Sequence, residues 1–128
     1  PSLWGGMGAR FMKDHILSKI KVKNGAEFTM EVDPGTWTHE MITAWKELGL
    51  NRISIGTQTL DPKFLKIMDR DHSLDESFSL LRFCQKEGWN FSLDFLLGLP
   101  FSQEKKRNIK SELDQLLSYG PKNISLYI

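Results

Sequence analysis

One pattern recurs three times along the chain: an amphipathic helical segment ends at a glycine, and a short run with high strand propensity follows a polar turn. The recurrences lie at residues 49–54, 88–92 and 120–125. A fourth strand is predicted at residues 28–32, ahead of a strong turn signal at residues 33–35. Strands that alternate with helices run parallel, with right-handed crossovers. The sequence therefore predicts an α/β fold with helices outside a parallel sheet, which is either open or part of a barrel.

The predicted helices carry their own start signals. Thr38 suits the N-cap of one helix, and Asp61 followed by Pro62 suits the start of a second helix at residues 63–68. Ser73 and Glu76 have the spacing of a capping box for a third helix. The apolar residues expected to face the sheet are Ile42, Trp45 and Leu48, then Leu80, Leu81 and Cys84, and in the last helix Ile109, Leu113, Leu116 and Leu117.

Length and composition describe one ordinary globular domain and exclude several classes of protein. The 128 residues suffice for one core, and no apolar run reaches the roughly 18 residues of a membrane span. A net charge of +1 predicts no nucleic-acid partner. The lone Cys84 cannot form an intramolecular disulfide, and by itself it cannot hold a zinc ion or an iron–sulfur cluster. We therefore expect a cytoplasmic protein in which these residues ligate no metal.

The front of the chain is rich in glycine. It begins with Pro1 and shows neither the basic nor the apolar segment of a signal peptide, so we expect it to be cut from a longer protein. Residues 4–8, Trp-Gly-Gly-Met-Gly, invite comparison with a phosphate-binding loop. They lack its Gly-Lys-Ser/Thr ending, and no strand precedes them. A turn or a helix start is the favoured interpretation.

Three polar residues lie along the predicted strands toward the edge where parallel α/β folds bind their ligands. Glu31 can bind an amine or a ribose hydroxyl, or it simply faces solvent. Gln58 follows Gly56, which would let a ligand or a neighbouring backbone approach, and capping of the next turn is the alternative role for Gln58. Asp94 interrupts an apolar run in a strand predicted to be central, where a buried carboxylate needs a partner. Function is favoured over a structural hydrogen bond only for Asp94.

A short polar loop between two predicted helices carries Arg70 and His72. Arginine can bind a carboxylate through two hydrogen bonds, and histidine can transfer a proton. Most loops of this kind are only solvated, and the loop's own residues favour that alternative. Cys84 lies on an apolar helix face and is predicted to be a packed core thiol.

Five motifs occur in order along the chain: Glu-Val-Asp-Pro-Gly-Thr at residues 31–36, Arg-Ile-Ser-Ile-Gly-Thr-Gln at 52–58, Arg-Asp-His at 70–72, Asp-Phe-Leu-Leu-Gly-Leu-Pro at 94–100 and Asn-Ile-Ser-Leu-Tyr at 123–127. Together they resemble the radical S-adenosylmethionine (radical SAM) family of oxygen-independent coproporphyrinogen III oxidases and their haem-chaperone relatives. Residues 1–3 also resemble the end of the family's Gly-Gly-Gly-Thr-Pro-Ser-Leu segment. The resemblance thus covers nearly the whole chain.

The resemblance implies a partial, six-stranded β/α barrel, of which residues 1–128 supply about the third to the sixth strand of the radical SAM core domain. It also implies that S-adenosylmethionine is bound at the positions of Glu31, Gln58, Arg70 and Asp94. The family's Cys-x-x-x-Cys-x-x-Cys motif, which holds a [4Fe-4S] cluster, has no counterpart here, and Cys84 does not match it. We therefore do not expect this stretch alone to bind a cluster or to cleave S-adenosylmethionine.

The family has two branches with different functions, and whether the parent protein is an enzyme depends on the branch. The oxidase branch oxidatively decarboxylates two propionates of coproporphyrinogen III, whereas the chaperone branch binds haem for delivery to an acceptor protein. Residues 34–36, the pair Arg70 and His72, and residues 120–127 look more like the chaperone branch. The expected partner is thus a tetrapyrrole, either haem or coproporphyrinogen III. A cluster-less α/β module with only a binding or structural role is the alternative from a different class.

Overall fold

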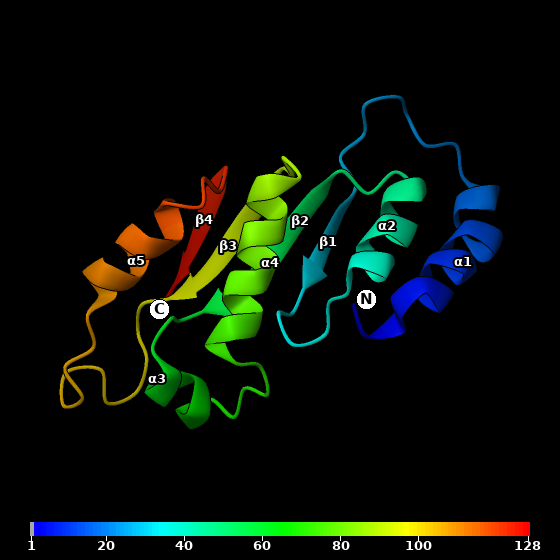
Figure 1. The fold of residues 1–128 in the computed structure, drawn as a ribbon. Helices are drawn as coiled ribbons and strands as arrows, with labels where there is room; N and C mark the ends of the chain where they lie inside the picture. Colours follow the sequence, from blue (N-terminus) through cyan, green and yellow to red (C-terminus); the bar gives the residue numbers. More distant parts are fainter. Residues whose placement is uncertain (1) are drawn as a thin grey trace.

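The computed structural model describes residues 2–128, which contain one four-stranded parallel sheet (Figure 1). The strands are β1 (Thr29–Val32), β2 (Arg52–Gln58), β3 (Phe91–Leu96) and β4 (Asn123–Tyr127), in the spatial order β1-β2-β3-β4. All three neighbouring pairs are parallel, with Glu31 opposite Ser54 and Asp94 opposite Ser125. The predicted α/β fold and its four strands are confirmed.

Helices connect the strands and cover one face of the sheet. The connecting helices are α2 (His39–Glu47) between β1 and β2, α3 (Pro62–Ile67) and α4 (Leu74–Lys86) between β2 and β3, and α5 (Ile109–Leu117) between β3 and β4. Figure 1 shows α2, α4 and α5 on the same side of the sheet. Before β1, α1 (Gly5–His15) lies beside α2 between two short 3-10 helices, η1 (Ser2–Trp4) and η2 (Leu17–Lys19). Within residues 2–128, the opposite face of the sheet carries no helix.

The predicted helix starts are confirmed by capping hydrogen bonds. The Thr38 hydroxyl accepts from the backbone N–H of Met41 at 3.0 Å. Asp61 caps α3, which runs from Pro62 to Ile67, one residue earlier than the predicted 63–68. Ser73 forms the complete capping box of α4 with Glu76. Each of these helices therefore begins where its local sequence specifies.

Glycines end the helices as the repeated pattern predicts. Gly88 follows α4 and Gly120 follows α5, with φ of +66° and +73°. This left-handed conformation reverses the chain direction after a helix, and only glycine adopts it without strain. Trp4 is the N-cap of α1 and residues 5–8 form its first turn, so the helix-start interpretation is confirmed over the phosphate loop. Pro1, part of the motif at residues 1–3, lies outside the described residues.

The core lies between the sheet and the helices. Fully buried residues of the sheet include Ile53, Ile55 and Leu93, which pack in one cluster with Leu80 and Leu116 of the helices. The predicted apolar stripes are correct except in α5, where Leu117 is 55% exposed. Leu117 lies about 80° around the helix from Ile109, at the border of the stripe. No helix within residues 2–128 is long and apolar enough to cross a membrane.

Candidate ligand-binding site

The helix-free face of the sheet is polar. Alternate residues of a strand point to opposite faces, so Ser54 of β2 and Asp94 of β3 share this face while their neighbours enter the core. The Ser54 hydroxyl donates to Asp94 Oδ2 at 3.1 Å and accepts from the Ser92 hydroxyl at 3.1 Å. Arg52 Nη2 donates to Ser92 Oγ at 3.0 Å. A hydrogen-bonded chain therefore leads to Asp94, which is half-buried rather than fully buried and has its partner.

Glu31 and Gln58 approach each other over Gly56. A Cβ atom at Gly56 would lie 3.4 Å from Gln58 Nε2 and 4.0 Å from Glu31 Oε1. The missing side chain of Gly56 thus leaves room for the amide and the carboxylate above the sheet. Glu31 is exposed and Gln58 is half-buried.

Gln58 ends β2 with an unusual backbone. The register between β2 and β3 shifts between Ile55 and Gln58, and φ of Gln58 is +60°. A non-glycine residue in this left-handed region is uncommon and costs about 1–3 kcal/mol, and such residues cluster at functional sites. The distortion sets the direction in which the Gln58 amide leaves the strand.

Arg70 and His72 both lie against Asp33, which follows β1. Arg70 Nη1 is 3.5 Å from Asp33 Oδ2, and His72 Nδ1 is 3.4 Å from Asp33 Oδ1. His72 is only 4% exposed, which corrects the expectation of a solvated loop. It is buried because it packs against Gly35, where an added Cβ would lie 3.0 Å from the His72 Cβ. Neither ring nitrogen of His72 makes a hydrogen bond within residues 2–128.

The structure brings three of the four predicted site residues to one surface. Glu31, Gln58 and Asp94 lie on the helix-free side of the sheet, whereas Arg70 is in the loop between α3 and α4. Within residues 2–128, the ion pair of Arg70 is with Asp33, and it makes no hydrogen bond to the other three. The turn signal at residues 33–35 and the motif at residues 31–36 do not predict that Asp33 pairs with Arg70. The site offers two carboxylates and an amide, with a guanidinium at the end of β1.

Cys84 is part of the core, as predicted. It is completely buried on α4, and this burial raises the pKa of its thiol to about 12. Within residues 2–128, no group of three or more His, Cys, Asp or Glu side chains is placed to hold a metal ion. Because iron–sulfur clusters are held by several thiolates, the described residues do not fit such a cluster.

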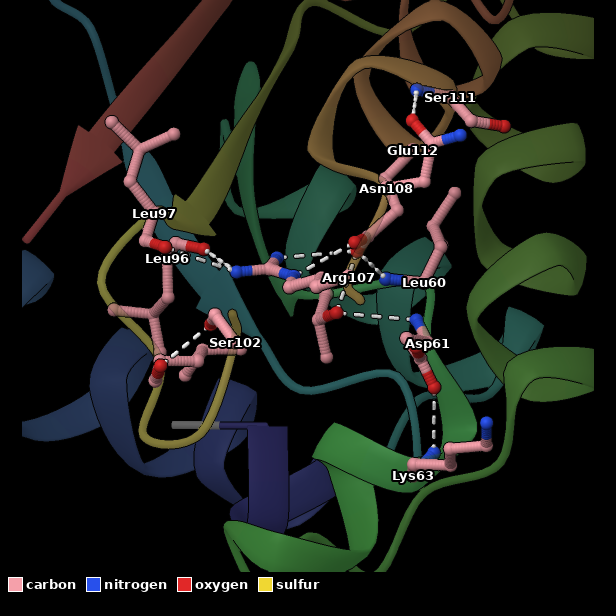
Figure 2. Close-up of polar contacts among 12 residues, drawn as sticks. Leu60, Asp61, Lys63, Leu96, Leu97, Ser102, Arg107, Asn108, Ser111 and Glu112 are labelled. Carbon is pink, nitrogen blue, oxygen red and sulfur yellow. Dashed lines mark hydrogen bonds and ion pairs between the residues drawn. The ribbon is translucent and has the colours of Figure 1, made fainter. Parts of the chain in front are cut away.

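A buried ion pair that sequence analysis missed lies beside the site (Figure 2). Arg107 Nε is 2.8 Å from Glu112 Oε1, and the two side chains are 0% and 8% exposed. One signal was available in the sequence: Glu112 lies three residues after Ile109 and four before Leu116, on the apolar face of α5. A charged residue in such a stripe requires a buried partner.

The fold and these side chains define a class of protein, a parallel β/α domain with polar side chains gathered on the helix-free face of its sheet. The model of the Radical SAM superfamily matches residues 5–124. The chain belongs to this superfamily, whose members use S-adenosylmethionine and a [4Fe-4S] cluster.

Curated relatives support the predicted resemblance. The chain is 32% identical over 127 residues to heme chaperone HemW of Buchnera aphidicola subsp. Schizaphis graminum, and 30% identical over 128 residues to that of Escherichia coli. It is also 30% identical over 128 residues to the oxygen-independent coproporphyrinogen III oxidase of Paracoccus denitrificans. Each alignment includes 99% of this chain but only 33%, 33% and 28% of the relatives. The chain thus spans about a third of their length, and the predicted family is confirmed.

Solved structures confirm the fold. The coproporphyrinogen III oxidase HemN of Escherichia coli, a radical SAM enzyme, matches with a TM-score of 0.79 at 22% identity, over 93% of this chain and 27% of that one. Elp3 of Methanocaldococcus infernus matches with a TM-score of 0.69 at 20% identity, over 79% of this chain and 24% of that one. The parallel sheet and its helices therefore correspond to part of a radical SAM TIM-like barrel.

Proposed function

We propose that this chain forms the S-adenosylmethionine-binding part of a radical SAM protein that acts on a tetrapyrrole, most like the haem chaperones. Residues 1–128 would supply about the third to the sixth strand of the core domain. The observation that carries the proposal is the placement of Glu31, Gln58 and Asp94 on the helix-free face of the sheet, in a chain that belongs to this superfamily.

The side chains of the site fit the polar groups of S-adenosylmethionine. Its ammonium and ribose hydroxyls are hydrogen-bond donors. The carboxylates of Glu31 and Asp94 can accept hydrogen bonds from them. The Gln58 amide can both donate and accept. Arg70 uses Nη1 toward Asp33, so its other N–H groups are available for the ligand's carboxylate. The four residues would bind and orient the ligand on a surface from which the helices are absent.

The radical chemistry of the complete protein needs a [4Fe-4S] cluster, and residues 1–128 do not supply its cysteine ligands. When S-adenosylmethionine is bound beside a reduced cluster, it supplies a 5′-deoxyadenosyl radical. Cys84 is buried on the other side of the sheet, so the cysteines for a cluster would come from outside these 128 residues. The contribution of this chain is to bind and orient the ligand.

Two tetrapyrroles are candidates for the second ligand. The relatives named heme chaperones favour haem. Transfer of haem to an acceptor protein in the cytoplasm is part of our proposal. The Paracoccus denitrificans relative, named as an oxidase, favours coproporphyrinogen III as the alternative. Binding of each by the reconstituted full-length protein under anaerobic conditions distinguishes them, because a chaperone retains haem and an oxidase converts coproporphyrinogen III.

The ligand site is tested by replacing its carboxylates in the full-length protein. We expect Asp94→Ala and Glu31→Ala each to weaken S-adenosylmethionine binding about 10- to 100-fold, since each removes a charge-assisted hydrogen bond. Calorimetry measures the affinity, and the cluster's visible absorbance should stay unchanged. Asp114→Ala, at an exposed carboxylate of α5, is the matched control. Wild-type affinity in both site variants would exclude this assignment of the pocket.

A further inference from the structure

The buried pair Arg107–Glu112 contacts the chain on both sides of the candidate site. On one side, Glu112 Oε2 accepts from the Thr59 hydroxyl at 2.6 Å and from the backbone N–H of Leu60 at 2.7 Å. These two residues directly follow Gln58. Thr59 Oγ1 in turn accepts from the backbone N–H of Asp61 at 3.1 Å, which extends the network to the start of α3. Figure 2 shows the contacts of Leu60 and Arg107 converging on the Glu112 carboxylate.

On the other side, Arg107 binds the end of β3. Its Nη1 donates to the carbonyl of Leu96 at 2.6 Å and to that of Leu97 at 3.2 Å, two and three residues after Asp94. The guanidinium carbon also lies 4.9 Å from the centre of the Phe95 ring. A rigid, forked guanidinium holds two carbonyls and a carboxylate together in a way that no apolar side chain can.

Stability alone does not account for a buried ion pair at this position. Removing two charges from water is costly, and well-packed apolar residues in place of a buried pair are often as stable. What the pair supplies is geometry, because its contacts join three segments: the turn after β2, the end of β3 and the first turn of α5. Gln58 adopts a strained backbone with φ of +60°, and such a conformation persists only where its surroundings fix it.

We propose that Arg107 and Glu112 are positioning residues for the ligand site. Glu112 holds the turn that keeps Gln58 in its left-handed conformation, and Arg107 holds the strand end that carries Asp94. Neither residue is among the four that would contact the ligand, so each acts through another residue. This inference rests on the proposed function, because it assigns the pair to the same S-adenosylmethionine site.

The test uses conservative variants of the pair in the full-length, reconstituted protein. Glu112→Gln keeps the size and one acceptor oxygen but loses the charge, and Arg107→Lys keeps the charge but loses the fork. We expect each to weaken S-adenosylmethionine binding about tenfold or more, because a displacement of the order of an ångström at a binding group has effects of this size. Amide hydrogen exchange at Leu60 should accelerate in Glu112→Gln, since its acceptor is altered.

Two controls separate positioning from general stability. Asp114→Asn weakens the exposed pair Lys110–Asp114 on the same helix and should change neither the affinity nor the exchange at Leu60. Leu116→Ala removes a fully buried side chain of α5 and should lower the thermal midpoint while leaving the affinity near that of the wild type. If the pair positions the site, the affinity for S-adenosylmethionine should fall in Glu112→Gln and Arg107→Lys but not in Leu116→Ala, whatever the change in thermal midpoint.

The outcomes distinguish this inference from the proposed function. If Asp94→Ala loses affinity while Glu112→Gln and Arg107→Lys retain it, the positioning role is wrong and the ligand site stands. If every variant, Leu116→Ala included, loses affinity in proportion to the decrease in its thermal midpoint, the pair is structural and the inference fails. If the wild-type protein does not bind S-adenosylmethionine, the proposed function fails, and the inference with it. Should Glu112→Gln not fold, Arg107→Lys decides the question.

Discussion

At the scale of single residues, environment decides the role of a side chain more than its chemical type does. Asp94 and Asp114 are both aspartates on regular elements, but Asp94 accepts a hydrogen bond from Ser54 on the helix-free face and Asp114 pairs with Lys110 in solvent. The first carboxylate belongs to the proposed ligand site, whereas an exposed pair of the second kind contributes little to stability. Neighbouring leucines of α5 show the same dependence.

Leu116 and Leu117 provide a matched test of burial. Leu116 is 0% exposed and Leu117 is 55% exposed. We expect Leu116→Ala to lower the free energy of unfolding by about 2–5 kcal/mol, because it leaves a cavity in the core. Leu117→Ala should change it by no more than about 0.5 kcal/mol. Urea denaturation of the full-length protein measures both, and equal losses would contradict the burial seen in α5.

At the scale of elements, the start of α4 combines a cap with a titratable group. Glu76 accepts from the backbone N–H of Ser73 at 2.7 Å and from the Ser73 hydroxyl at 2.9 Å. These two hydrogen bonds, with a smaller effect of the nearby His72, lower the pKa of Glu76 below its ordinary 4.5. A lowered pKa in the folded state means that the ionised carboxylate stabilises the helix above pH 4.5, and that this stabilisation is lost as the pH falls through the lower value.

The pH dependence of the cap can be measured with Glu76→Gln. At about pH 7 we expect this variant to be less stable than the wild type, because the charged acceptor at the helix start is missing. At about pH 3 the difference should be smaller, because the stabilisation that the lowered pKa of Glu76 provides decreases once the pH falls below the ordinary 4.5. Urea midpoints at the two pH values give the comparison. Glu87, exposed at the other end of α4, supplies the matched control Glu87→Gln, which leaves the capping box intact.

At the scale of the whole molecule, the four-stranded sheet has two edges. Within residues 2–128, β1 and β4 each pair on one side only. β4 carries no charged residue along its length, Asn123–Tyr127, and Leu126 is 53% exposed. A strand edge of this kind pairs readily with another chain. Exposed apolar residues of α1 and of η1 before it, among them Trp4 and Met7, add to this tendency.

We therefore expect the 128-residue chain, expressed alone, to self-associate. Size-exclusion chromatography with light scattering should show species larger than the monomer at micromolar concentration. Leu126→Lys places a charge on the edge strand and should shift the distribution toward the monomer, because charged edge residues oppose pairing. A monomer with one sharp thermal transition would show that neither edge of the sheet is accessible.

The elements and their order follow from local sequence. Local signals act between near neighbours in the chain, so they can be recognised without a structure. Examples are the cap formed by Ser73 with Glu76, the glycine that ends a helix at Gly88, and the alternation of strand and helix. The common surface of Glu31, Gln58 and Asp94 was also predictable, because parallel strands align their carboxyl ends. Arg70 was already a candidate from its own loop, and the family resemblance then grouped it with these three.

Tertiary packing sets the burial of His72, the exposure of Leu117 and the pairing of Arg107 with Glu112. Each depends on which distant segment lies against the residue: the hydrogen bond from Thr59 to Glu112, for example, joins positions 53 residues apart. No local pattern specifies such a contact, because its free energy depends on how the helices and strands pack after they have formed. The same packing holds Gln58 in its left-handed conformation, which the identity of a glutamine does not predict.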